Sequence, residues 1–175
     1  DLRVFFINNK KRIDIYADKK TLKYLKKSFS YSFKNGFGYP AILKANKLKN
    51  IFNLGSGNQL ITFEAIKVKH GKINSIGYIF NNSAYIADCN QLSKTNIEKL
   101  KNLKYFIIDC LRFKPHPSHF CFKEVLSILK EIKPKKTILT NLHSDLDYNI
   151  LLKKSPINVK PAFDGLKIQL WNEKK

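Results

Sequence analysis

The chain has 175 residues, 43% of them hydrophobic, which is enough for one domain with a buried core and excludes wholesale disorder. No apolar run approaches the roughly 18 residues of a membrane helix, and the amino end lacks a signal-peptide pattern, so we expect a soluble, cytoplasmic protein with no membrane partner. The formal net charge is +20.

The first half of the chain contains sequence signals for strands, a helix cap and turns. Residues 13–17 alternate apolar and polar side chains, and Asp18 then opens a segment with helical spacing of its apolar residues. Asn81-Asn82-Ser83 is a turn composition between two apolar runs. In chain order we predict a strand over 13–17, a helix after Asp18, a loop over 33–40, extended segments over 41–48 and 59–69, and a hairpin of 75–80 and 84–87.

After the hairpin, helical patterns alternate with short apolar strands. The predicted helices cover 94–103, 120–132 and 147–153, and the predicted strands cover 105–108, 137–139 and 166–170. No repeat or low-complexity linker interrupts this rhythm. We therefore predict a single α/β domain over residues 1–175.

The charge allows two interpretations. A basic balance of this size is typical of proteins that bind nucleic acid. However, lysine, isoleucine and asparagine make up 67 of the 175 residues, as AT-rich codons would produce, and the lysines are spread along the whole chain. Biased composition is the favoured explanation, so nucleic acid is a possible partner that is not favoured.

Polar side chains follow several predicted strands. His70, Asp88, Asp109 and His143 each come at or shortly after a strand end. Loops at one sheet edge are where α/β proteins gather ligands, and imidazole with carboxylate suits zinc or manganese. Each residue alone has a simpler explanation, since a loop histidine is often just exposed and an aspartate after a strand is often a helix cap.

Seven segments together resemble one known family. They are His70-Gly71, Ser75–Tyr78, Ala84–Asp88, Ile108–Phe113, Pro115–Phe120, His143–Tyr148 and Pro161–Gly165. In this order they resemble the metallo-β-lactamase-fold family, in the branch of the phosphodiesterase of the carbon-phosphorus lyase pathway and its bacterial relatives. The resemblance implies an αβ/βα metallo-β-lactamase sandwich that is incomplete at the amino end.

The resemblance also implies a cofactor of two divalent metal ions, zinc or manganese. In the family these are held by an upstream His-x-His-x-Asp-His motif and three later ligands, which match His70, Asp88 and His143. The upstream motif is missing, and Asp1-Leu2-Arg3 resembles the residues that follow it. We therefore expect a carboxy-terminal portion that is inactive alone.

Roles for further residues follow from the same resemblance. His119 is the candidate general acid, with His116 as the alternative, because imidazole titrates near neutral pH. Asp109, Arg112 and Asp147 are expected to orient other groups or contact substrate, although Arg112 could instead pair with Asp109 and Asp147 could cap a helix. The aromatic 31–39 loop is either a lid or a surface cluster.

The complete protein is thus expected to hydrolyse a small or cyclic phosphodiester. The first alternative is an RNA-processing nuclease of the same fold, which the basic charge would favour. The second is a non-catalytic, basic nucleic-acid-binding domain that uses only the lysines. A homodimer is compatible with each of these.

Overall fold

A computed structural model describes residues 2–36 and 38–170. The chain divides into two compact units, Asp1–Lys49 and Asn50–Lys175. We describe each unit by itself, and the expectation of a single domain stays a prediction. All eight candidate site residues lie in the second unit.

The first unit is small and contains a two-stranded parallel sheet. Its elements are α1 (Arg3–Asn9), β1 (Ile13–Ala17), α2 (Lys19–Ser28), α3 (Ser30–Phe33) and β2 (Leu43–Lys47), with β1 paired to β2. Asp18 caps α2 by accepting from the backbone N–H groups of Lys20 and Thr21 at 2.8 and 3.2 Å. The predicted strand over 13–17, the helix after Asp18 and the extended segment over 41–48 are confirmed.

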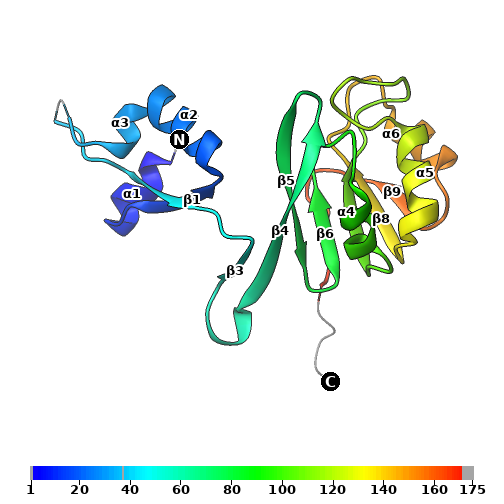
Figure 1. Ribbon diagram of the computed structural model, residues 1–175, viewed down its shortest axis with the longest axis horizontal. Coiled ribbons are helices and arrows are strands. Elements are labelled where there is room, and N and C mark those ends of the chain that lie inside the picture. Colours follow the sequence, from blue (N-terminus) through cyan, green and yellow to red (C-terminus); the bar gives the residue numbers. More distant parts are fainter. Residues whose placement is uncertain (1, 37, 171–175) are drawn as a thin grey trace. The chain divides into compact units, whose positions relative to one another are not determined.

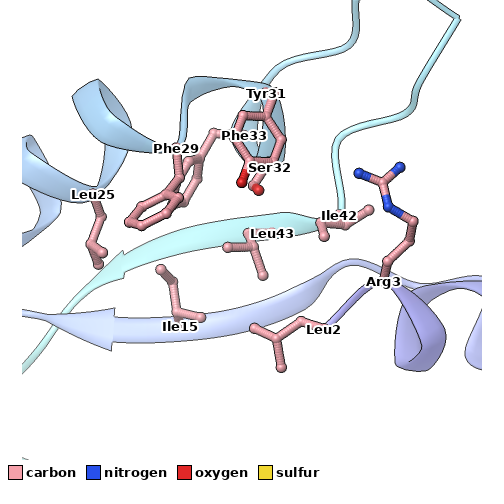
Figure 2. Close-up of a pocket in the computed structure, with 10 residues that line it drawn as sticks. All are labelled: Leu2, Arg3, Ile15, Leu25, Phe29, Tyr31, Ser32, Phe33, Ile42 and Leu43. Atoms are coloured by element: carbon pink, nitrogen blue, oxygen red, sulfur yellow. The ribbon is translucent and has the colours of Figure 1, made fainter.

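The aromatic segment of this unit is only partly a loop. Tyr31 and Phe33 belong to the short helix α3, so the loop prediction was wrong for their positions. Both side chains line an apolar hollow of about 620 Å³ within the unit, together with Phe29 and Ile42 (Figure 2). That this segment acts as a lid remains a prediction.

The second unit contains a seven-stranded sheet whose strands lie side by side in chain order. The strands are β3 (Ile51–Leu54), β4 (Ile61–His70), β5 (Ile73–Phe80), β6 (Ser83–Ile86), β7 (Tyr105–Asp109), β8 (Lys136–Thr140) and β9 (Val159–Pro161). Pairing is antiparallel from β3 to β6 and parallel from β6 to β9. The helices between the parallel strands are α4 (Lys94–Leu100), α5 (Phe122–Ile132) and α6 (Tyr148–Lys154).

Local chemistry explains the predicted hairpin. Asn81 and Asn82 join β5 to β6 with φ values of 44° and 54°. Asparagine tolerates this left-handed region, and two such residues make the turn whose twist suits a hairpin. The predicted hairpin is therefore confirmed.

The core lies between the parallel strands and the helices. Phe106, Ile108 and Leu139 are fully buried in β7 and β8, and Val125 and Ile132 of α5 are buried in the same cluster. In Figure 1, α4 is drawn alongside β6 and α5 alongside β8. Burial of one apolar face of α5 is what its 3.6-residue periodicity predicts.

Two predicted elements after the hairpin differ from the structure by more than two residues. The segment 166–170, expected as a final strand, has no strand structure; the last strand is instead β9, which pairs with β8. This strand has three residues and ends in a proline, so it is too short to show a period of two. The helix expected over 94–103 ends at Leu100, shortly before Asn102 takes a φ of 58°.

The topology brings four strand ends to one edge of the sheet. Two antiparallel pairings separate β4 from β6, so these strands run in the same direction, and β7 and β8 run parallel to β6. The carboxyl ends of all four strands therefore meet at one edge, as the sequence argument required. In the part of the chain that is described, no helix is long and apolar enough to span a bilayer.

Gly77 in β5 offers a test of the sheet packing. A Cβ at this position would lie 2.7 Å from Cγ1 of Ile86, which is fully buried. We expect Gly77→Ala to lower the free energy of unfolding by about 1–3 kcal/mol through overpacking. Urea unfolding would measure this, with Asn74→Ala at an exposed position of the same strand as the control. An unchanged or raised midpoint for Gly77→Ala would contradict the packing described.

Candidate metal centre

The candidate centre lies at the edge where the strands end. His70 is the last residue of β4, Asp88 follows β6 by two residues, and Asp109 is the last residue of β7. His119 comes from the loop between β7 and α5. Backbone bonds hold this loop against its neighbours, because Phe120 N–H donates to Cys89 O at 2.8 Å.

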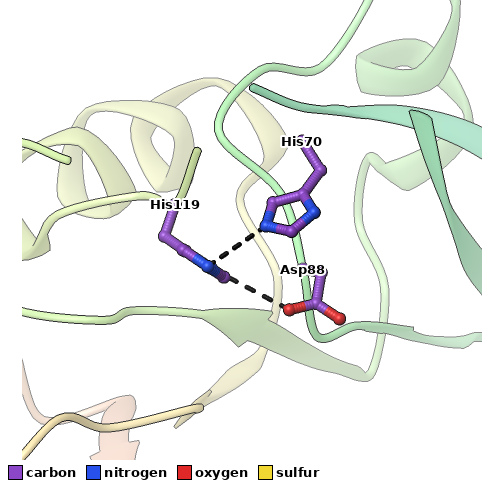
Figure 3. Close-up of side chains that lie close together, drawn as sticks. All are labelled: His70, Asp88 and His119. Carbon is purple, nitrogen blue, oxygen red and sulfur yellow. Dashed lines mark hydrogen bonds and ion pairs between the residues drawn. The ribbon is translucent and has the colours of Figure 1, made fainter. Parts of the chain in front are cut away.

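His70, Asp88 and His119 form a compact group of possible ligands (Figure 3). Nε2 of His70 lies 3.1 Å from Nε2 of His119, and Nδ1 of His119 lies 3.9 Å from Oδ1 of Asp88. One ligand atom from each residue lies within 4.8 Å of the other two. Two imidazoles and a half-exposed carboxylate are donors that suit a divalent ion such as zinc, so these residues fit the metal that the sequence predicts.

A buried carboxylate supports His119 from behind. Asp109 is fully buried, and its Oδ2 lies 2.7 Å from Nδ1 of His119 and accepts the Cys89 N–H at 2.9 Å. Burial raises the pKa of Asp109 above its ordinary value, and the hydrogen bonds from Cys89 and His119 oppose this shift. A carboxylate that bonds to one nitrogen of an imidazole fixes which ring nitrogen carries hydrogen.

Two asparagines that the sequence analysis did not select also belong to this centre. Asn141 follows β8 and donates to Asp109 Oδ1 at 3.2 Å. Asn90 accepts the Gly71 N–H at 2.9 Å and donates to Pro117 O at 3.0 Å, which ties the loop after His70 to the loop before His119. Their position just after strands was the available signal, but asparagine there is also common in ordinary turns.

His116 lies beside His119 without joining the ligand group. Their ring centroids are 5.1 Å apart, and His116 Nδ1 lies 3.3 Å from the Ser118 N–H. Desolvation, and then the charge of Arg112, lower the pKa of His116 below its ordinary value. The geometry leaves His119, and not His116, in contact with Asp109.

His143 is placed differently from the group in Figure 3. Its side chain is 50% exposed, and its Nδ1 lies 3.4 Å from Oδ1 of Asp145. Its backbone N–H donates to Leu111 O at 2.9 Å, which anchors the loop after β8 to the loop after β7. The ligand role of His143 stays a prediction, because the compact group consists of the other three residues.

Arg112 points its guanidinium along its own loop. Nη2 donates to Pro115 O at 2.9 Å, and Nε is buried with no hydrogen-bond partner among residues 2–36 and 38–170. Among the described residues, Asp109 takes its hydrogen bonds from Cys89, His119 and Asn141, so the alternative pairing of Arg112 with Asp109 is not formed. A phosphate contact for Arg112 remains a prediction.

Asp147 caps α6. Its Oδ1 accepts the Ile150 N–H at 2.9 Å, which satisfies one of the free donors at the start of that helix. We expect Asp147→Ala to lower the free energy of unfolding by about 0.5–2 kcal/mol, and Asp147→Ser to restore most of this loss. Urea unfolding and a zinc titration would check both variants. A lower zinc affinity with unchanged stability would instead indicate a ligand role.

Comparisons with known proteins agree with this architecture. The profile of a family described as "Beta-lactamase superfamily domain" matches residues 1–141. A solved diphosphatase from the PhnP family is 28% identical, with a TM-score of 0.78 over 90% of this chain and 58% of that one. An octanoyltransferase of Porphyromonas gingivalis (strain ATCC BAA-308 / W83) is 25% identical over 160 residues, which is 89% of this chain and 32% of that relative.

Two more distant structures show the same fold. YhfI of Bacillus subtilis, a metallo-beta-lactamase fold protein, is 17% identical with a TM-score of 0.68 over 91% of this chain and 66% of its own. Zn(2+)-bound PqqB of Methylobacterium extorquens is 10% identical with a TM-score of 0.70 over 91% and 65%. The chain thus spans about a third of the curated relative and under two thirds of these structures. The predicted metallo-β-lactamase fold is confirmed.

Proposed function

The chain belongs to the beta-lactamase superfamily, and from this premise we propose that the complete protein is a metal-dependent phosphodiesterase that acts on a small or cyclic phosphodiester. The observation that carries the proposal is the His70, Asp88 and His119 group with Asp109 behind it. This group combines a place for a cation with an imidazole that can move a proton, and phosphodiester hydrolysis needs both.

His70, Asp88 and His143 are the residues that would hold divalent metal, and His119, which lies close to His70 and Asp88, is kept for proton transfer. When bound, such an ion supplies Lewis-acid stabilisation of charge on phosphoryl oxygens and lowers the pKa of a water ligand. The cytoplasmic location and the use of zinc or manganese remain part of the proposal.

His119 would supply the proton for the leaving group. Its Nδ1 faces the Asp109 carboxylate, so that in the protonated ring only the hydrogen on Nε2 is free to be given away. Nε2 lies 3.1 Å from Nε2 of His70, on the side where a substrate bound at the cation would place its leaving oxygen. Asp109, whose Oδ2 lies 2.7 Å from Nδ1, orients the ring for that transfer.

A second candidate substrate is a diphosphate. The similarity to a PhnP-family diphosphatase favours it, because that protein shares 28% of aligned residues over 90% of this chain. A diphosphate linkage releases a phosphate that leaves without added protonation more readily than an alkoxide does. The two candidates therefore make different demands on His119.

The test uses a form of the chain that carries the His-x-His-x-Asp-His motif at its amino end. This protein should be loaded with Zn²⁺ or Mn²⁺. Four substrates should then be offered separately: a cyclic ribose phosphate, bis-nitrophenyl phosphate, a nucleoside diphosphate ester and a short RNA. Hydrolysis of the small diesters, lost on chelation, supports the proposal. Hydrolysis of RNA alone would favour the nuclease alternative, and no metal-dependent hydrolysis of any substrate would refute the proposal.

A further inference from the structure

Asn141 approaches the centre from the loop after β8. Its Nδ2 donates to Ala87 O at 3.3 Å and to Asp109 Oδ1 at 3.2 Å. An amide nitrogen carries two hydrogens, and each has an oxygen to bond here. This pattern fixes the orientation of the amide. If the amide were flipped, its oxygen would lie against two other acceptor oxygens, Ala87 O and Asp109 Oδ1.

The amide completes the hydrogen bonding of a buried carboxylate. Oδ2 of Asp109 is shared by Cys89 N–H and His119, whereas Asn141 is the only side chain in the described residues that donates to Oδ1. Asp109 is fully buried, so an oxygen without a donor would be costly. Asn141 itself is exposed and makes no contribution to the buried core.

The same amide affects which nitrogen of His119 carries the hydrogen in the neutral ring. Nδ2 of Asn141 lies 3.3 Å from Nδ1 of His119, yet both of its hydrogens are directed to oxygens. Nδ1 therefore meets an acceptor, Asp109, and keeps its hydrogen. The lone pair of the neutral ring is left on Nε2, 3.1 Å from His70.

We propose that Asn141 is a positioning residue: by holding Asp109 it keeps His119 as the Nδ1–H tautomer, with Nε2 turned toward the candidate cation and substrate. The consequence for hydrolysis rests on the proposed function. The tautomer is a property of the chain itself and can be measured without metal or substrate.

Two substitutions remove the amide in different backbone settings. Asn141 has a φ of 58°, which glycine adopts freely and alanine does not. Asn141→Gly therefore removes only the amide, whereas Asn141→Ala adds backbone strain. Asn102, which is exposed and also has a φ of 58°, provides the matched control Asn102→Gly, because it precedes the first residue of β7 whereas Asp109 is the last.

The readouts are the tautomer of His119, from long-range ¹H–¹⁵N correlations of the metal-free chain, and the affinity for Zn²⁺ alone. We expect a single Nδ1–H tautomer in the parent chain and in Asn102→Gly, and a mixture of tautomers in both Asn141 variants. Zn²⁺ affinity should stay within a few-fold of the parent in those variants, because His119 is the proposed proton donor and the Asn141 amide bonds to Ala87 O and Asp109, not to the side chains of His70 or Asp88.

An unchanged tautomer in folded Asn141→Gly would overturn the proposal, whether or not Zn²⁺ affinity falls, because a merely structural role would not change the ring nitrogens. An effect in Asn141→Ala that is absent in Asn141→Gly would overturn it as well, since strain would then be the cause. Failure of the complete protein to hydrolyse any ester would refute only the proposed function, because the tautomer is measured in the metal-free chain.

Discussion

Replacing His119 with alanine should slow hydrolysis of an alkyl phosphodiester by about 10²- to 10⁴-fold in the metal-loaded, complete protein. An alkoxide is a poor leaving group, so the proton on Nε2 of His119 contributes most when it departs. A nitrophenolate leaves without a proton, and the loss on a nitrophenyl phosphodiester should therefore be much smaller. Rates on the two substrates, with metal content from elemental analysis, provide the test.

The control for this experiment is His116→Ala. His116 lies close to His119, but it is His119 that contacts Asp109. Any decrease in the hydrolysis rate of His116→Ala should therefore be the same for the alkyl and the nitrophenyl substrate. Equal losses on both substrates in His119→Ala, with metal retained, would mean that His119 positions the substrate. Loss of metal would mean that its Nε2 is a ligand, in keeping with its place beside His70 and Asp88.

Much of the second unit could be predicted because its signals are local. Asn81-Asn82 marks the hairpin, and apolar runs mark β7 and β8. Once these strands are ordered, His70, Asp88 and Asp109 must end at one edge. Short elements escaped prediction, since α1 has no side-chain cap and no buried residue, and β3 has four residues.

The finer geometry of the centre depends on contacts between residues far apart in the chain. Asn141 bonds to Ala87 across 54 positions, and His70 meets His119 across 49. Local hydrophobic periodicity carries no information about either contact. The sequence could therefore identify His119 as a functional histidine, but it could not predict that His119 lies next to His70 and Asp88. The resemblance to the family supplied the residues, and tertiary packing decides which of them touch.

Replacing Asp88 with alanine should have the largest effect on metal binding. Asp88 supplies the one carboxylate of the compact group, whose other members are His70 and His119. A divalent ion would then lose its one anionic ligand, which neutralises part of its charge. We expect the Zn²⁺ affinity of the 175-residue chain to fall by more than about 100-fold, the upper end of the loss seen when a group outside the ligand set is removed.

Asp145 provides the matched control for this prediction. It is an exposed aspartate beside His143, and its side chain is 62% exposed compared with 50% for Asp88. Asp145→Ala should leave Zn²⁺ affinity within a few-fold of the parent, and both variants should unfold within about 0.5 kcal/mol of it because neither side chain is buried. In the complete protein, Asp88→Ala should also abolish hydrolysis of both alkyl and nitrophenyl diesters, unlike His119→Ala. Equal Zn²⁺ affinities of the parent and Asp88→Ala would show that the cation binds elsewhere, and the group in Figure 3 would lose its assignment.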